Sequence, residues 1–126
     1  MADARRVRWL EDPEEKDYAA ARSYLSLLIA PEELDPLFER LRAAPSGSWR
    51  AKDILRAARL PLLDAKRSGE VAEKLLKIAA KEAISPILLV VLRSQPATQI
   101  ADGYHRTCAA FIAHEDTLVP GRILFA

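Results

Sequence analysis

Cysteine is nearly absent from this chain: Cys108 is the single cysteine among 126 residues. One cysteine excludes a disulfide within the chain and suits a reducing compartment, so we expect a cytoplasmic protein. No Cys/His cluster has the spacing of a metal site, and no Ser-His-Asp set is identifiable. There is no apolar signal core near the first residue and no apolar run long enough for a membrane span.

Net charge is also nearly absent. The 19 basic and 18 acidic residues leave a formal charge of +1. A protein that binds nucleic acid or a membrane surface usually carries a strong basic excess, so neither partner is expected. Half of the residues are hydrophobic and 29% are charged, which is typical of one globular domain with a short extension.

Residues 1–45 are predicted to form a helical N-terminal extension. Two amphipathic helices follow one another, and Pro31 separates them. Two short helices cannot bury their apolar faces on each other alone, so we expect both to dock on the rest of the chain. The segment Ala44–Ser48 combines helix-breaking and flexible residues and is the predicted boundary to a domain over 46–126. The apolar faces consist of Tyr18, Ala21, Leu25, Leu28 and Ile29 in the first helix and Leu34, Leu37, Phe38 and Leu41 in the second.

The next part of the chain is predicted to contain two more helices, over 49–58 and 70–82. Between them, Leu60–Leu63 is extended because Pro61 disfavours helix at the residue before it, and it is either an edge strand or a buried loop. The helix over 70–82 has two ion pairs in the favourable order four residues apart, Glu70–Lys74 and Glu73–Lys77. We interpret those charges as a solvated face.

The last third alternates strands with a helix. Residues 84–92 are continuously apolar, as in a strand covered on both faces. A short strand over 98–101, a helix over 105–114 and a final strand over 119–125 follow. In the helix, Cys108, Phe111 and Ile112 are predicted to point inward. The order of these helices and strands predicts a small α+β (mixed α/β) domain.

The turn from Asp102 to Arg106 is the strongest candidate site. An apolar strand ends at Asp102-Gly103, and a helix begins with Tyr104, His105 and Arg106. Unpaired N–H groups and the positive dipole end at a helix start favour a phosphate or another anion. The planar guanidinium of Arg106 adds donors that match phosphate oxygens. The segment is therefore predicted to bind phosphate.

Three segments in a fixed order carry a family resemblance. They are Ile84-Ser85-Pro86-Ile87, then Ile100-Ala101-Asp102-Gly103-Tyr104-His105-Arg106 with Ala109-Ala110, then Val119-Pro120-Gly121-Arg122-Ile123. Residues 49–126 thereby resemble the ParB/sulfiredoxin fold family. The resemblance implies a nucleotide (ATP, ADP or CTP), with Mg²⁺, whose phosphates lie at the Gly-x-x-Arg turn. On this reading Gly103 allows close backbone approach, His105 and Arg106 contact phosphates, and Ser85 lies at the rim of the pocket.

The chain also departs from that family. Sulfiredoxin has a reactive cysteine where this chain has Tyr104, and Cys108, one helical turn further on, is predicted to be core. Sulfiredoxin activity is therefore not expected. Centromere binding is not expected either, because no helix-turn-helix domain follows the closing strand. The Asp-Gly-x-His-Arg form is closest to members of the fold that act as small-molecule kinases, which suggests phosphoryl transfer or nucleotide hydrolysis.

The candidate residues have alternative roles. Asp102 is either a turn residue or a Mg²⁺ ligand or base beside the phosphates. His105 is a phosphate contact or an acid–base catalyst, and Tyr104 either stacks on a base or sugar or covers the turn. The alternative function is a non-catalytic interaction or regulatory module, whose N-terminal helices bind another protein or a second copy as a homodimer. A nuclease is the least favoured, given the near-neutral charge.

Overall fold

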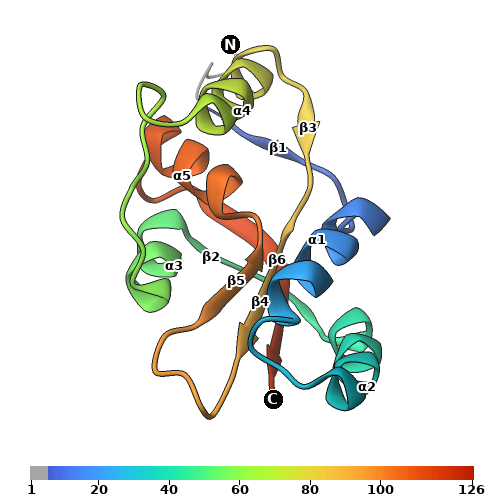
Figure 1. Cartoon of the computed structure of the whole chain (residues 1–126). Coiled ribbons are helices and arrows are strands. Elements are labelled where there is room, and N and C mark those ends of the chain that lie inside the picture. Colours follow the sequence, from blue (N-terminus) through green and yellow to red (C-terminus); the bar gives the residue numbers. More distant parts are fainter. Residues whose placement is uncertain (1–5) are drawn as a thin grey trace.

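The structure, a computed structural model, describes residues 6–126. Its centre is a four-stranded mixed sheet in the order β2-β6-β4-β5 (Figure 1). The final strand β6 lies inside the sheet, antiparallel to β2 and parallel to β4, and β5 is antiparallel to β4. The small α+β domain predicted from the sequence is confirmed. The strands are β2 (Ser46–Arg50), β4 (Ile87–Val91), β5 (Gln99–Asp102) and β6 (Leu118–Phe125).

The apolar run of β4 explains its place inside the sheet. Leu88 and Val90 pack with the N-terminal helices, whereas Ile87 and Leu89 pack with the helices on the other face. The run predicted as one strand over 84–92 is interrupted at Ser85-Pro86. The residues before the interruption form β3 (Ala83–Ile84), which pairs with β1 (Arg8–Trp9) in a separate two-stranded sheet. Proline lacks the N–H that a continuous ladder requires.

One face of the sheet is covered by α1 (Glu15–Leu25) and α2 (Pro31–Ala43). The docking predicted for the extension is thus confirmed, and the core that the two helices share with the sheet includes Tyr18, Ala21, Leu25, Leu34, Leu37, Phe38 and Leu41. One detail differs from the prediction. Helix α1 ends at Leu25, so Leu28 and Ile29 belong to the connection.

The other face is covered by α3 (Ala51–Ala58) and α5 (Tyr104–Ala113), and α4 (Gly69–Ala79) packs on α5. Cys108 is fully buried, as predicted. Ile112 is exposed, so its predicted inward direction is wrong. Within residues 6–126, no helix has both the length and the apolar character needed to cross a membrane.

The segment predicted as the boundary, Ala44–Ser48, contains the start of an edge strand. Residues Ser46–Arg50 form β2 and pair with β6 from Ser46↔Arg122 to Arg50↔Leu118. The predicted helix over 49–58 consequently begins later, at Ala51. Small polar residues have weak strand propensity, so only the pairing with β6 makes this segment extended. Leu60–Leu63 contains no strand and forms a connecting loop.

Candidate functional site

The predicted turn joins β5 to α5. Gly103 precedes the first helical residue with φ of 111°, a left-handed conformation that other residues adopt only with strain. A Cβ atom at this position would lie 2.3 Å from Cγ2 of Ile87. The glycine is therefore required by backbone conformation and by packing against β4. Its predicted purpose, the close approach of a ligand, remains a prediction.

Arg106, the predicted phosphate contact, is held by protein groups. Its Nη2 donates to Oδ2 of Asp102 at 2.9 Å and to the Pro86 carbonyl at 3.3 Å, and its Nη1 lies 3.5 Å from Oδ1 of Asp17. The side chain is only 11% exposed. Its Nε atom is also buried and has no hydrogen-bond partner among the described residues. The guanidinium thus contacts two carboxylates, where a contact with phosphate was predicted.

Asp17 and Asp102 surround one cation. Asp17 comes from α1, its side chain is 4% exposed, and its Oδ2 accepts the backbone N–H of Glu14 at 2.8 Å. Burial raises the pKa of the Asp102 carboxyl, Arg106 opposes that shift, and Asp17 reinforces it. With both carboxylates ionised the cluster would be buried with a net charge of −1, which is costly. Burial and the nearby Asp17 therefore make the charged form of Asp102 less favourable than that of an exposed aspartate.

Ser85 lies beneath the start of α1. Its buried hydroxyl donates to Oε1 of Glu14 at 2.9 Å. Glu14 is the residue that caps α1, so this contact attaches the helix to the sheet. Ser85 does not line the cavity at the start of α5, and its place at the rim of a nucleotide pocket remains a prediction.

Tyr104 and His105 extend toward α4 and the loop at residues 60–63. Nδ1 of His105 lies 2.9 Å from Oε2 of Glu70, and the Tyr104 hydroxyl donates to the Pro61 carbonyl. Glu70 was predicted to pair with Lys74. It reaches His105 instead, while Lys74 pairs with Glu73. The predicted pair of Glu73 with Lys77 is present.

Cys108 sits one helical turn below this surface. Burial raises the pKa of its thiol, which disfavours the thiolate that a nucleophile requires. Together with its complete burial, this is consistent with the interpretation of Cys108 as a core residue.

A cavity of about 380 Å³ opens at the start of α5. Its volume falls within the range of small-molecule sites. No side chain caps the N-terminus of α5. Neither Arg106 nor Ser85 contributes to the wall. The lining residues are Tyr24, Ala58, Leu60, Thr98, Gln99, Ile100, Ala101, Asp102, Gly103, Tyr104 and His105.

Seven of the eleven lining residues had not been identified as site residues from the sequence, among them Tyr24, Leu60 and Gln99. Tyr24, from α1, hydrogen-bonds with its hydroxyl to Oε1 of Gln99, and Leu60 comes from the loop after α3. Asp17 was also missed as a partner of Arg106. The spacing of Glu14 and Asp17 is that of a capping box and could have indicated a local role. No sequence signal indicates a partner 89 positions away.

Few side chains of the described residues are placed to bind a metal ion. Between residues 6 and 126 no three His, Cys, Asp or Glu side chains come together as a metal site. The predicted Mg²⁺ ligand Asp102 has one oxygen on Arg106. Mg²⁺ is commonly held by one or two carboxylates plus substrate phosphates. The role of Asp102 as a metal ligand therefore remains a prediction that requires a bound phosphate.

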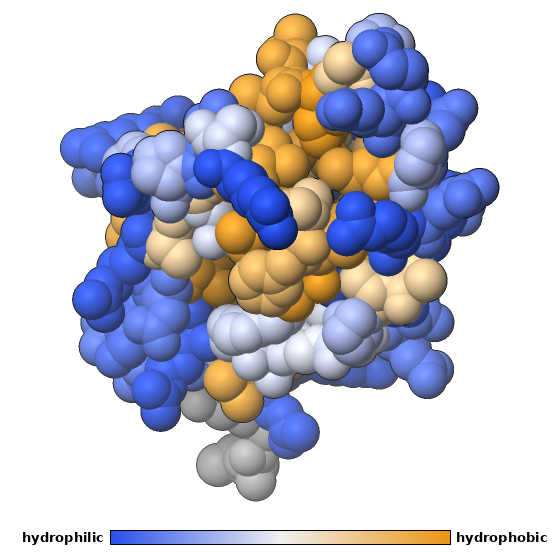
Figure 2. Space-filling view, turned by 90° about the horizontal axis from the view of Figure 1, so that it is seen from below, coloured by the Kyte–Doolittle hydropathy of each residue, from blue (hydrophilic) through white to orange (hydrophobic). Residues whose placement is uncertain are grey.

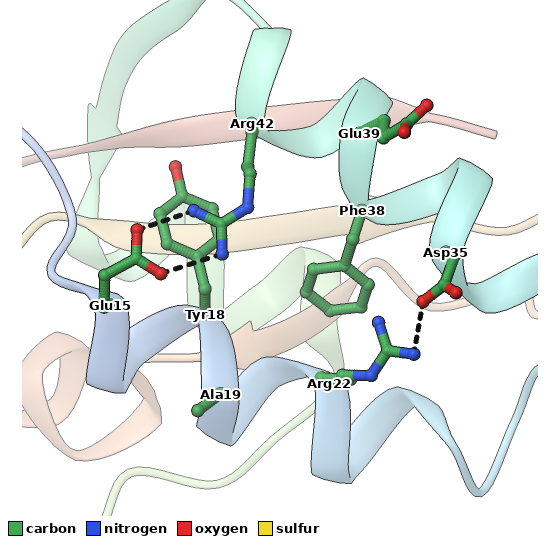
Figure 3. A pocket seen from close by; sticks show the side chains of 8 residues that line it. All are labelled: Glu15, Tyr18, Ala19, Arg22, Asp35, Phe38, Glu39 and Arg42. Atoms are coloured by element: carbon green, nitrogen blue, oxygen red, sulfur yellow. Dashed lines mark hydrogen bonds and ion pairs between the residues drawn. The ribbon is translucent and has the colours of Figure 1, made fainter.

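A second cleft, of about 460 Å³, lies between α1 and α2 (Figure 3). Arg42 lies over the Tyr18 ring, 4.2 Å from its centroid, and pairs with both oxygens of Glu15 at 2.8 and 2.9 Å. At the other end Arg22 lies over Phe38 and pairs with Asp35. Both guanidiniums are thus engaged by carboxylates, and we regard the cavity at α5 as the better candidate site.

Comparison with protein-family models, with curated proteins and with solved structures found no match. The resemblance to the ParB/sulfiredoxin fold family therefore rests on the three sequence motifs alone.

Proposed function

We propose that this protein binds a nucleotide or another phosphorylated small molecule in the cavity at the start of α5. The observation that carries the proposal is the cavity itself, whose wall includes the turn Asp102–His105 and the uncapped N-terminus of α5. Backbone N–H groups at a helix N-terminus attract phosphate through hydrogen bonds and the helix dipole. The order of the three ParB/sulfiredoxin-like motifs supports the same ligand class.

In this proposal different residues around the cavity have different roles in binding the ligand. The phosphate lies against the backbone at Tyr104 and His105, and the aromatic ring of Tyr24 or Tyr104 offers a surface on which a base can stack. Arg106 stabilises the turn from inside the protein. It does not line the cavity, and Asp102 and Asp17 hold its guanidinium, so direct contact with phosphate would require it to leave these partners.

A phosphoryl-transfer or hydrolytic activity would use the same turn. Such reactions depend mainly on positioning and on neutralisation of charge. In this proposal His105 contacts the phosphates, and Asp102 accepts a proton or holds Mg²⁺ beside them. The raised pKa of Asp102 would suit a carboxyl that exchanges a proton with a substrate.

Calorimetric titration tests the ligand. ATP, ADP, CTP and inorganic phosphate are each added with Mg²⁺ to the wild type and to two tryptophan variants. Leu60→Trp fills the cavity and is expected to abolish binding. Leu62→Trp changes a leucine of similar exposure that does not line the cavity, and should bind normally. Absence of binding to the wild type at millimolar concentration would overturn the proposal.

Phosphorus NMR of the same mixtures tests for a reaction. Conversion of the nucleotide by the wild type, lost in Asp102→Asn or His105→Gln while binding is retained, would assign catalysis to the turn. Binding without conversion would restrict the function to recognition.

The alternative, an interaction module that uses the N-terminal helices, now needs a different surface. The apolar faces that motivated it are buried against the sheet. The partner remains a prediction, but the parts of α1 and α2 that are available to it are the outer faces and the ends.

A further inference from the structure

The end of the molecule that bears the C-terminus carries an exposed apolar patch. Figure 2 shows this end, with apolar side chains surrounded by hydrophilic ones. Leu27 is 83% exposed and Phe125 is 68% exposed. A leucine exposed to this degree contributes nothing to the core of the chain that carries it, and large exposed apolar patches commonly mark interaction sites.

A groove of about 640 Å³ lies next to Leu27, which directly precedes two residues of the groove wall. Phe125 follows Leu124 of the α1/α2 core, so its own side chain points to the other face of the sheet, away from the groove. The molecule therefore presents a projecting apolar side chain, Leu27, beside an apolar depression. The apolar part of the wall consists of Leu28, Ile29, Pro36, Leu37, Leu92 and Ala126.

The same groove carries charges of both signs. Glu32 and Glu33 lie in the first turn of α2, and Arg40 and Arg93 also line the wall. Arg40 donates to the carbonyl oxygen of Phe125 at 3.3 Å. The other three form no ion pair with any residue from 6 to 126. A rim with two carboxylates and two guanidiniums is complementary to a copy of itself.

We infer that this end of the molecule is the contact between two copies of the chain related by a two-fold axis. In such a contact each surface meets its own equivalent, so a projection and a depression on one face satisfy both copies at once and the assembly closes as a dimer. Leu27 of one copy enters the groove of the other, and the acidic start of α2 faces the arginines of the partner. The cavity at α5 shares no residue with this groove, so the inference is independent of the proposed ligand.

Sedimentation equilibrium across a range of concentrations tests the inference. The wild type should approach twice the 14.0 kDa mass of the chain as concentration rises. Leu27→Glu should raise the dissociation constant at least about tenfold, as expected for a central apolar contact. Leu76→Glu is the matched control, because Leu76 is 72% exposed on α4 and should change nothing.

Charge reversal tests the pairing itself. Neither Glu32→Arg/Glu33→Arg nor Arg40→Glu/Arg93→Glu should dimerise alone, because like charges would then face each other. An equal mixture of the two double variants should restore a dimer that contains one copy of each. Adding Leu27→Glu to both partners should abolish that mixed dimer, which distinguishes this contact from general attraction between oppositely charged proteins.

Circular dichroism confirms that each variant is folded, so loss of the dimer reports on the contact. A wild type that stays at 14.0 kDa up to its solubility limit would overturn the inference. A dimer equally sensitive to Leu76→Glu, or insensitive to Leu27→Glu, would also overturn it, because the contact would then lie elsewhere.

Discussion

Two arginines of this protein bind carboxylates in very different surroundings. Arg106 is 11% exposed and lies between Asp17 and Asp102, whereas Arg42 is 46% exposed and pairs with Glu15 on the outside of α1 and α2 (Figure 3). Arg42 has the better hydrogen-bond geometry, with two short contacts to one carboxylate. Burial, and not the number or length of the contacts, decides how strongly each arginine matters to the fold.

The physical reason is the unequal cost of breaking each pair. Water solvates a charge left unpaired at the surface, so an exposed pair contributes little. A carboxylate left unpaired inside the protein keeps its desolvation cost without compensation. Arg106 therefore connects β5 and α5 to α1. The turn Asp102–His105, which directly precedes it, lines the cavity. The predictions below probe that contrast, starting with the largest effect.

Arg106→Ala is expected to lower the free energy of unfolding by about 3–5 kcal/mol, because it leaves the buried Asp17 and the partly buried Asp102 without their cation. Urea denaturation measures the loss. Arg106→Lys keeps a charge but not the planar fork, and should lose less. An Arg106→Ala variant as stable as the wild type would show that the buried cluster does not hold α1 to the sheet.

Gly103→Ala is expected to cost about 2–4 kcal/mol, from a left-handed backbone and from overpacking against Ile87. The same denaturation experiment measures it. Gly69→Ala provides the control, since a Cβ atom there meets nothing within 4 Å. If both variants unfold at the same urea concentration, the tight packing beneath the turn is not a source of stability.

The pH dependence of stability should differ in sign between two aspartates. The raised pKa of Asp102 means that the folded state holds its proton more tightly than the unfolded state, so its contribution is present at acidic pH and is lost as pH rises through the folded pKa. Asp102→Asn should therefore gain stability relative to wild type as pH rises. The pKa of Asp116 is lowered mainly by its hydrogen bond from Lys52, so Asp116→Asn should lose relative stability over the same rise.

Urea denaturation at a series of pH values, from acidic to neutral, gives both differences. A difference between Asp102→Asn and wild type that stays constant with pH would contradict the assigned shift. The Asp116 effect should be the smaller one, because its side chain is 44% exposed and solvent screens the pair.

Arg42→Ala should produce the smallest change, a shift in the urea midpoint close to the error of the measurement. Its pairing with Glu15 is exposed, so water solvates the carboxylate that the substitution leaves unpaired. Glu15→Gln serves as a second test of the same pair. A loss as large as that of Arg106→Ala would remove the contrast between the two arginines.

Much of the fold was predictable because it depends on local pattern. Helical spacing located α1, α2, α4 and α5, and the apolar run located β4. Errors occurred where a distant partner decides the conformation. Ser46–Arg50 is extended through its pairing with β6, and Ile112 is exposed on α5 although its spacing favoured the core. The partner of Glu70 is His105, from another helix, where spacing alone favoured Lys74.

The turn at Gly103 shows most clearly what each level determines. The order of an apolar strand, Asp-Gly and a polar helix start was enough to predict the turn, since backbone preferences and hydrophobic period act locally. Only the tertiary structure decided which groups the side chains of this turn contact. Asp17 lies 89 positions from Arg106 in the sequence and contacts its guanidinium. Tyr24, from the same helix as Asp17, lines the cavity at α5. Long-range packing creates both features, because burial and proximity of distant residues exist only after the chain has folded.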